Sequence, residues 1–145
     1  MSKKDMSDNS GFSVQNRIIF FSSVDVNKNM AAIASAHMVL DPFPSSGFLT
    51  ILQSLALGVP VVSLSNPSSR MSGRFAEAVY SMMNYTSLLA PTISEYIQLA
   101  LSLTHNPRIR ASHTEAIMER RHFLFETLPQ AKQDWKRFLE LVHAV

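Results

Sequence analysis

The sequence predicts an α/β domain built on a parallel sheet, followed by a segment made of helices alone. Short apolar runs alternate with helical patterns up to about residue 90, and beyond that point apolar residues recur at helical spacing. A loop of small and polar residues, 42–47, also separates one apolar run from an apolar helix. Alternating strands and helices are typical of parallel strands that are joined by right-handed crossovers.

The expected strands are short apolar runs at residues 18–21, 39–40, 61–64 and 88–89. The first run is β-branched and aromatic, which is typical of a buried strand. Residues 1–16 are polar, so we expect a flexible tail there and one domain over residues 17–145.

The expected helices lie at residues 29–36, 48–57 and 70–84, and then in three further stretches towards the end of the chain. Gly58 suits the left-handed position that ends the apolar helix, and Pro60 prevents its continuation. Thr92 with the glutamate three residues later resembles a capping box. Asn106 followed by Pro107 is a typical helix start.

The last helix carries an apolar stripe at positions i, i+3, i+4 and i+7, formed by Trp135, Phe138, Leu139 and Val142. Such a stripe is more typical of a helix that faces the core than of an exposed one. Where a neighbouring domain is missing, the same stripe would be an exposed docking face.

Composition argues against several classes of protein. The formal net charge is only +2 and no dense basic stripe is present, so we expect no nucleic-acid partner. The chain has no cysteine, which excludes a disulfide framework, and its five histidines form no i, i+4 pair, so we expect no metal. The most apolar stretch, residues 48–64, is interrupted by Gln53, Gly58 and Pro60, so we expect no membrane span and a cytoplasmic or nucleocytoplasmic location.

The loop 42–47 is the best candidate for a ligand site, because open α/β sheets bind ligands where a strand leads into a helix. Ser45, Ser46 and Thr50 supply hydroxyl groups, and Gly47 allows a ligand to approach the backbone closely. The first amides of the helix lack internal partners and can hold a phosphate. An ordinary loop between strand and helix is the alternative, since neither a Walker lysine nor a G-x-G-x-x-G pattern is present.

Three charged residues near this loop have two interpretations each. Asp41 could contact a ligand or could cap the backbone of the loop, and capping is favoured because aspartate commonly accepts from nearby amides. Arg70 and Arg74 could neutralise a diphosphate or could be solvated surface residues.

Four segments carry a resemblance to a known family. They read RIIF at residues 17–20, VLDPFP at 39–44, SGFLT at 46–50 and LALGVPVV at 55–62. Together they resemble the C-terminal part of the catalytic region of the O-linked N-acetylglucosamine transferase family, which includes SPINDLY-type protein fucosyltransferases. The similarity covers nearly everything after residue 16.

The resemblance implies the Rossmann-like C-terminal half of a GT-B glycosyltransferase, which holds a UDP-sugar donor and needs no separate cofactor. It implies donor-binding roles for residues of the loop, of the helix start and of the two positions that flank the nucleotide in the family. These are Asn29, Ser45, Ser46, Gly47, Phe48, Leu49, Thr50 and Gln53. The groups that act on the acceptor belong to the other half of a GT-B enzyme, so no catalytic residue is assigned to this chain.

The chain departs from the family pattern at several of these positions. Phe48 and Leu49 stand where the family has hydroxyl-bearing or imidazole side chains, and Gln53 replaces an acidic residue that binds the ribose. Asn29 replaces a histidine, and Val26 replaces a lysine. An uncharged partner forms hydrogen bonds of roughly half the strength, so we expect weakened donor binding.

The leading functional prediction is the donor-binding half of a protein O-glycosyltransferase, an N-acetylglucosaminyltransferase by class, that is inactive on its own. Its expected partners are a nucleotide-sugar donor, a protein Ser/Thr acceptor, and the N-terminal GT-B domain or tetratricopeptide repeats of the family. The alternative is a non-catalytic interaction module or a degenerate remnant of that family. A stand-alone flavodoxin-like domain is a third, weaker interpretation.

Overall fold

The computed structural model describes residues 17–20, 25–65, 71–124 and 127–143, and the predicted tail at 1–16 lies outside these ranges. The described elements run in chain order from α1 to α6. They are α1 (Val26–Ser35), β1 (Val39–Leu40), α2 (Phe48–Ala56), β2 (Val61–Leu64), η2 (Met71–Gly73), α3 (Phe75–Met82), β3 (Leu89–Ala90), α4 (Ile93–His105), α5 (Pro107–Arg120), η3 (Arg121–Leu124) and α6 (Thr127–His143), where η marks a 3-10 helix.

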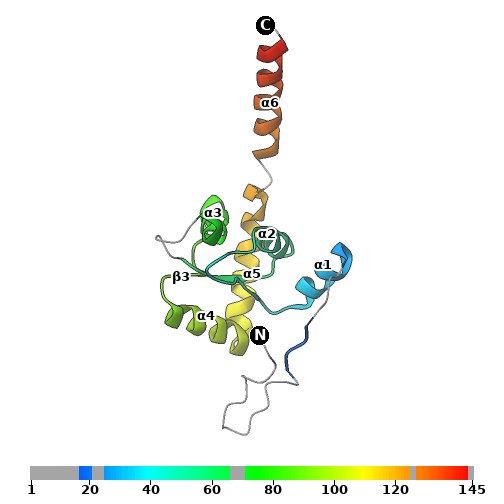
Figure 1. The fold of residues 1–145 in the computed structure, drawn as a ribbon. Helices are drawn as coiled ribbons and strands as arrows, with labels where there is room; N and C mark the ends of the chain where they lie inside the picture. Colours follow the sequence, from blue (N-terminus) through cyan, green and yellow to red (C-terminus); the bar gives the residue numbers. More distant parts are fainter. Residues whose placement is uncertain (1–16, 21–24, 66–70, 125–126, 144–145) are drawn as a thin grey trace.

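The sheet has the parallel arrangement that the sequence predicts. Its order is β1-β2-β3, and β2 pairs in parallel with both neighbours. The register places Val39 opposite Val61, and Ser63 opposite Leu89. In Figure 1, α2 and α3 lie on one face of the sheet and α4 lies on the other, while α5 packs against α4 and α2. The fold class is therefore α/β, as expected.

The core lies between β2 and the helices on both faces. Val61 and Val62 of β2 are fully buried, and Ile51 and Leu55 of α2 pack against them. A strand covered on both faces should be continuously apolar, which explains the VVSL sequence of β2. Leu103 of α4 and Ile117 of α5 are completely buried in the same cluster.

The helix ends follow the capping signals of the sequence. The side chain of Thr92 accepts a hydrogen bond from the Glu95 amide at 3.2 Å, and α4 begins at the next residue. Asn106 accepts from two amides of the first turn of α5, with Pro107 as its first residue. Gly58 follows α2 with φ +76°, the left-handed conformation that the sequence predicts.

Two helices differ from their expected bounds for local reasons. The helix α1 begins at Val26, three residues earlier than predicted, because Asp25 caps it by accepting from the Lys28 amide at 2.9 Å. The helix expected over residues 70–84 is divided into the short η2 and then α3.

The prediction of a strand over residues 18–21 is wrong for residues 18–20, which the structure describes. Residues 18–20 lie in no strand, and Ile19 and Phe20 are 76% and 85% exposed. Phe21 lies outside the described ranges. A strand needs a neighbour, and no described strand lies beside the outer edge of β1 or beside this run.

The apolar stripe of α6 is exposed, so the interpretation as a core-facing helix is wrong for this structure. Trp135 is 64% exposed, and the other stripe residues are more than half exposed. Figure 1 shows α6 extending away from the body formed by the sheet and the other helices. The exposure agrees with the alternative interpretation of this stripe, an exposed docking face, and whether anything docks there is not tested by it.

Candidate functional site

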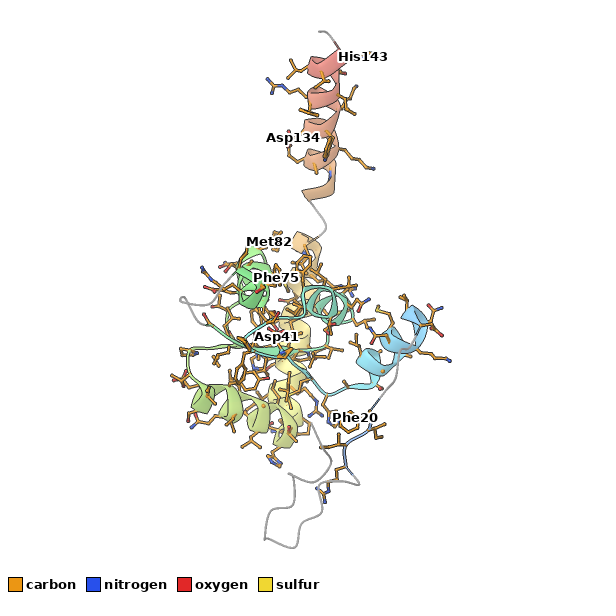
Figure 2. The ribbon with its side chains drawn as sticks, viewed as in Figure 1. Phe20, Asp41, Phe75, Met82, Asp134 and His143 are labelled. Carbon is orange, nitrogen blue, oxygen red and sulfur yellow. The ribbon has the colours of Figure 1, made fainter. Side chains whose placement is uncertain are left out.

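The loop 42–47 lies where the sequence predicts it, at the carboxyl end of β1, and it leads directly into α2. Figure 2 shows Asp41, the residue that follows β1, at the sheet within the main body of the molecule. In a parallel α/β sheet this edge is the usual position of a ligand. The position of the loop is therefore suitable for binding, and its hydrogen bonds decide what it can hold.

The side chain of Asp41 accepts hydrogen bonds from two residues of the loop. This side chain is almost fully buried, with 3% exposure. One carboxylate oxygen, Oδ2, accepts from the hydroxyls of Ser46 and Ser63, both at 2.7 Å. The other, Oδ1, accepts from the Gly47 amide at 3.0 Å. The capping role favoured by the sequence is confirmed, since the carboxylate is used within the protein.

Two amides of the loop point inward. The Ser46 amide donates to the carbonyl of Ser72 at 2.8 Å, and the Gly47 amide donates to Asp41. The helical bonds of α2 begin with Ile51, whose amide donates to the Gly47 carbonyl at 2.9 Å. Between these positions, the amides of residues 48, 49 and 50 have no acceptor among the residues that the structure describes. Among the described residues, acceptors are therefore found for the Ser46 and Gly47 amides of the loop, but not for the three amides of the first turn of α2.

The side chains around this first turn are mainly apolar. Phe48 and Leu49 are exposed, and the Phe48 ring contacts that of Phe75 from α3, with 5.1 Å between ring centroids. Ser45 and Thr50 are also exposed, so their hydroxyls can reach a ligand. A Cβ on Gly47 would lie 3.7 Å from the Thr50 side chain, an ordinary contact, so the local backbone does not require glycine there.

The remaining two predicted residues bind each other. The Asn29 side-chain amide donates to Gln53 Oε1 at 3.1 Å, which joins α1 to α2. Both side chains are half-buried. The structure thus brings together the two positions that the resemblance assigns to the nucleotide. This bond does not use the side-chain oxygen of Asn29, Oδ1, or the hydrogens on Gln53 Nε2, so these atoms can bind a third group.

Arg74, one of the two arginines predicted to lie near a diphosphate, already forms an ion pair. The Arg74 Nε donates to Glu77 Oε2 at 2.9 Å, and hydrogen bonding and charge attraction from this glutamate raise the pKa of Arg74. Arg74 therefore forms a helix-start ion pair with its own α3. Arg70, the other candidate, lies outside the described residues.

Two residues of the site were not singled out from the sequence as part of it. Ser63 binds Asp41 from β2, and Tyr96 of α4 donates from its hydroxyl to the Asp41 carbonyl at 3.1 Å. A serine within a buried apolar strand was a usable signal, because a buried hydroxyl needs a partner. The long-range contact from Tyr96 of α4 had no such signal.

The described ranges contain no group of three or more His, Asp or Glu side chains that could hold a metal ion. Within the same residues, no helix is both long enough and apolar enough to cross a bilayer.

No protein-family model and no curated protein matches the chain. Among solved structures, the chain is similar to a mutant of the O-GlcNAc transferase of Thermobaculum terrenum, with 24% sequence identity and a TM-score of 0.64. The similarity covers 84% of this chain and 25% of that one, so the chain spans about a quarter of the neighbour's length. The expected fold, a parallel-sheet α/β unit like part of a GT-B enzyme, is thereby confirmed. The relation to O-GlcNAc transferases is one of fold.

Proposed function

We propose, from a fold shared with part of an O-GlcNAc transferase, that this chain is the donor-binding half of a nucleotide-sugar-dependent glycosyltransferase. The proposed donor is a UDP-sugar, UDP-N-acetylglucosamine by preference, and the proposed acceptor is a protein Ser or Thr hydroxyl. One observation carries the proposal. The first turn of α2, at the carboxyl end of β1, presents three amides that have no acceptor among the residues that the structure describes.

The first turn would bind the diphosphate through oriented backbone dipoles. Amides 48–50 share the partial positive charge at the start of α2, which is worth about 0.3–1 kcal/mol for each negative charge nearby. The exposed Thr50 hydroxyl adds one side-chain donor. Donors fixed in this way favour the charge that develops on the diphosphate as the sugar leaves.

The Asn29–Gln53 pair would lie beside the ribose. Because Gln53 Oε1 already accepts from Asn29, the groups left for a ligand are the Gln53 amide hydrogens and the Asn29 carbonyl. An uncharged pair gives weaker hydrogen bonds than a carboxylate does. We therefore expect UDP affinity weaker than micromolar for this chain.

Calorimetric titration of the full chain with UDP tests the proposal. The informative variant is the double substitution Leu49→Thr with Gln53→Asp, which restores a hydroxyl at the helix start and a carboxylate one turn later. We expect UDP to bind the double variant at least tenfold more tightly than the natural sequence. A matched control is Leu141→Thr, because Leu141 is similarly exposed but lies on α6. Failure of both the natural chain and the double variant to bind UDP at millimolar concentration would overturn the proposal.

A complete reaction needs the second half of a GT-B enzyme, so we expect no glycosyl transfer by this chain alone. The proposed partners are a protein acceptor and an N-terminal GT-B domain or repeat domain. The proposed location is the cytoplasm, or cytoplasm and nucleus together, where protein acceptors of this kind would be met.

A non-catalytic interaction module is the second candidate, and the uncovered stripe of α6 favours it. Trp135 and its neighbours form an apolar face that no described residue covers. This function predicts stable binding of a protein partner through α6 together with no response to UDP in the titration above.

A further inference from the structure

A buried carboxylate beneath the proposed diphosphate site has no role in the proposed function so far. Asp41 accepts three hydrogen bonds, one from β2 and two from the loop that leads into α2. All three donors are neutral, and hydrogen bonds to an ionised acceptor are about twice as strong as those between neutral groups. Asp41 therefore connects the sheet to the start of α2 more firmly than an ordinary turn residue would.

The backbone of Asp41 is fixed on both sides. Its amide donates to the Val62 carbonyl at 2.9 Å, within the pairing of β1 with β2. Its carbonyl accepts from the hydroxyl of Tyr96, which reaches across from α4. On the side chain, Ser63 holds Oδ2 from the neighbouring strand. Asp41 is consequently anchored to the sheet through its backbone and through Ser63, and the loop residues Ser46 and Gly47 bind to this anchored carboxylate.

The start of α2 has no side-chain cap of its own. The N-cap residue is Gly47, which carries no side chain, and its amide is held by Asp41 Oδ1. The direction of the next three amides depends on the orientation of Gly47 and Ser46. Because Asp41 binds both of these residues, it determines where the free amides of α2 point.

We propose that Asp41 and Ser63 are positioning residues that aim the first-turn amides of α2 at the diphosphate, an inference that rests on the proposed function. Ser63 acts through Asp41, since it lies in β2 and is almost fully buried. Removing the Ser63 hydroxyl leaves the carboxylate with one donor fewer and a less restricted orientation. The effect on a ligand is specific, because only the phosphate-binding part of the site should be disturbed.

The first test compares Ser63→Ala with the natural chain in titrations with UDP and with uridine, which lacks the diphosphate. Ser63 does not touch the ligand, so only part of the loss of its hydrogen bond to the carboxylate should reach the amides, which predicts roughly 3- to 10-fold weaker UDP binding with uridine binding unchanged. Ser63→Thr keeps the hydroxyl and should restore UDP binding. The control is Ser35→Ala, an exposed serine whose hydroxyl donates to the Ala32 carbonyl within α1. Equal losses for UDP and uridine, or no loss for either, would refute the positioning role.

The second test does not need a ligand, so it separates this inference from the proposed function. Amide hydrogen exchange followed by NMR should show a protected Gly47 amide in the natural chain. Ser63→Ala should accelerate exchange at Gly47 and leave the Val62–Asp41 pairing protected. Ser46→Ala, which removes the other donor to Oδ2 without altering the strand, should have the same effect. Unchanged exchange at Gly47 in both variants would overturn the inference, whatever UDP does.

Discussion

An added methyl group at Gly58 should lower the free energy of unfolding for two separate reasons. The residue follows α2 and leads into β2 with φ +76°. In this left-handed conformation, a Cβ crowds the carbonyl oxygen and destabilises the folded state by about 1–2 kcal/mol relative to glycine. An added Cβ would also lie 2.8 Å from Met118 Sδ and 3.0 Å from its Cγ, from α5. Because these atoms lie towards the end of a flexible and exposed side chain, relief of that overlap adds only about 1 kcal/mol, the lower end of the range for overpacking.

The two contributions predict that Gly58→Ala lowers the free energy of unfolding by about 2–3 kcal/mol. For a chain of this size that is a fall of the melting temperature on the order of 8 °C. Urea denaturation followed by circular dichroism measures the change directly. The matched variants are Met118→Ala and the double variant, because Met118 is partly exposed and its own truncation should cost little.

The double variant separates the backbone from the overlap. If both arguments hold, Met118→Ala should recover about 1 kcal/mol of the loss in Gly58→Ala and leave the backbone part untouched. A loss below about 0.5 kcal/mol in Gly58→Ala would refute the argument from the left-handed conformation. A full loss that Met118→Ala does not reduce would refute the argument from the contact.

Three further predictions concern other parts of the molecule. Tyr80→Phe should lower the free energy of unfolding by about 1–3 kcal/mol in urea denaturation, because the buried Tyr80 hydroxyl donates to the Val61 carbonyl and accepts from the Val61 amide; an unchanged midpoint would contradict this. Burial lowers the pKa of His113 below 6.5, so the imidazole binds a proton more readily in the unfolded chain than in the folded one. The free energy of unfolding should therefore fall as the pH drops from about 7 to 5. His113→Gln should flatten that fall, and an equally steep fall in the variant would exclude His113 as its source. Trp135→Ala should change the free energy of unfolding by less than about 0.5 kcal/mol, because the side chain is exposed. In the natural chain, iodide should quench the fluorescence of Trp135, the sole tryptophan, in the folded state. Protection from iodide would show that α6 is covered.

The local signals of the sequence predicted most of the elements. Thr92, Asn106 and Gly58 mark helix ends in the structure because caps and left-handed positions depend on a few neighbouring atoms. The parallel direction of β1, β2 and β3 also follows from alternation of strands and helices. Local chemistry was sufficient for these features.

Features that depend on distant partners were not predictable in the same way. The run at residues 18–20 has the composition of a strand, but pairing requires a second strand, which composition cannot reveal. Likewise, the stripe of α6 has the spacing of a buried face, and spacing alone does not say whether anything covers it. Both errors have the same cause, since burial is a property of the neighbour as much as of the segment.

The candidate site was predicted in position but not in its internal bonds. The sequence placed the loop and favoured Asp41 as a cap, since both follow from the order of strand, turn and helix. The direct bond from Asn29 to Gln53 joins residues of two helices, and nothing in the pattern of either helix indicates it. The assignment of the eight candidate residues to a nucleotide stays a prediction that the titrations above test.

The complete burial of Ile117 means that the core of this protein can be completed only late in its synthesis. The sheet is finished at Ala90, yet the cluster around β2 closes only when α4 and α5 are present. A ribosome-bound chain that has exposed only residues up to about 100 therefore still has one side of its sheet in water. Arrest peptides that report mechanical tension should register folding only after α5 has left the exit tunnel, and shorter nascent chains should bind holding chaperones.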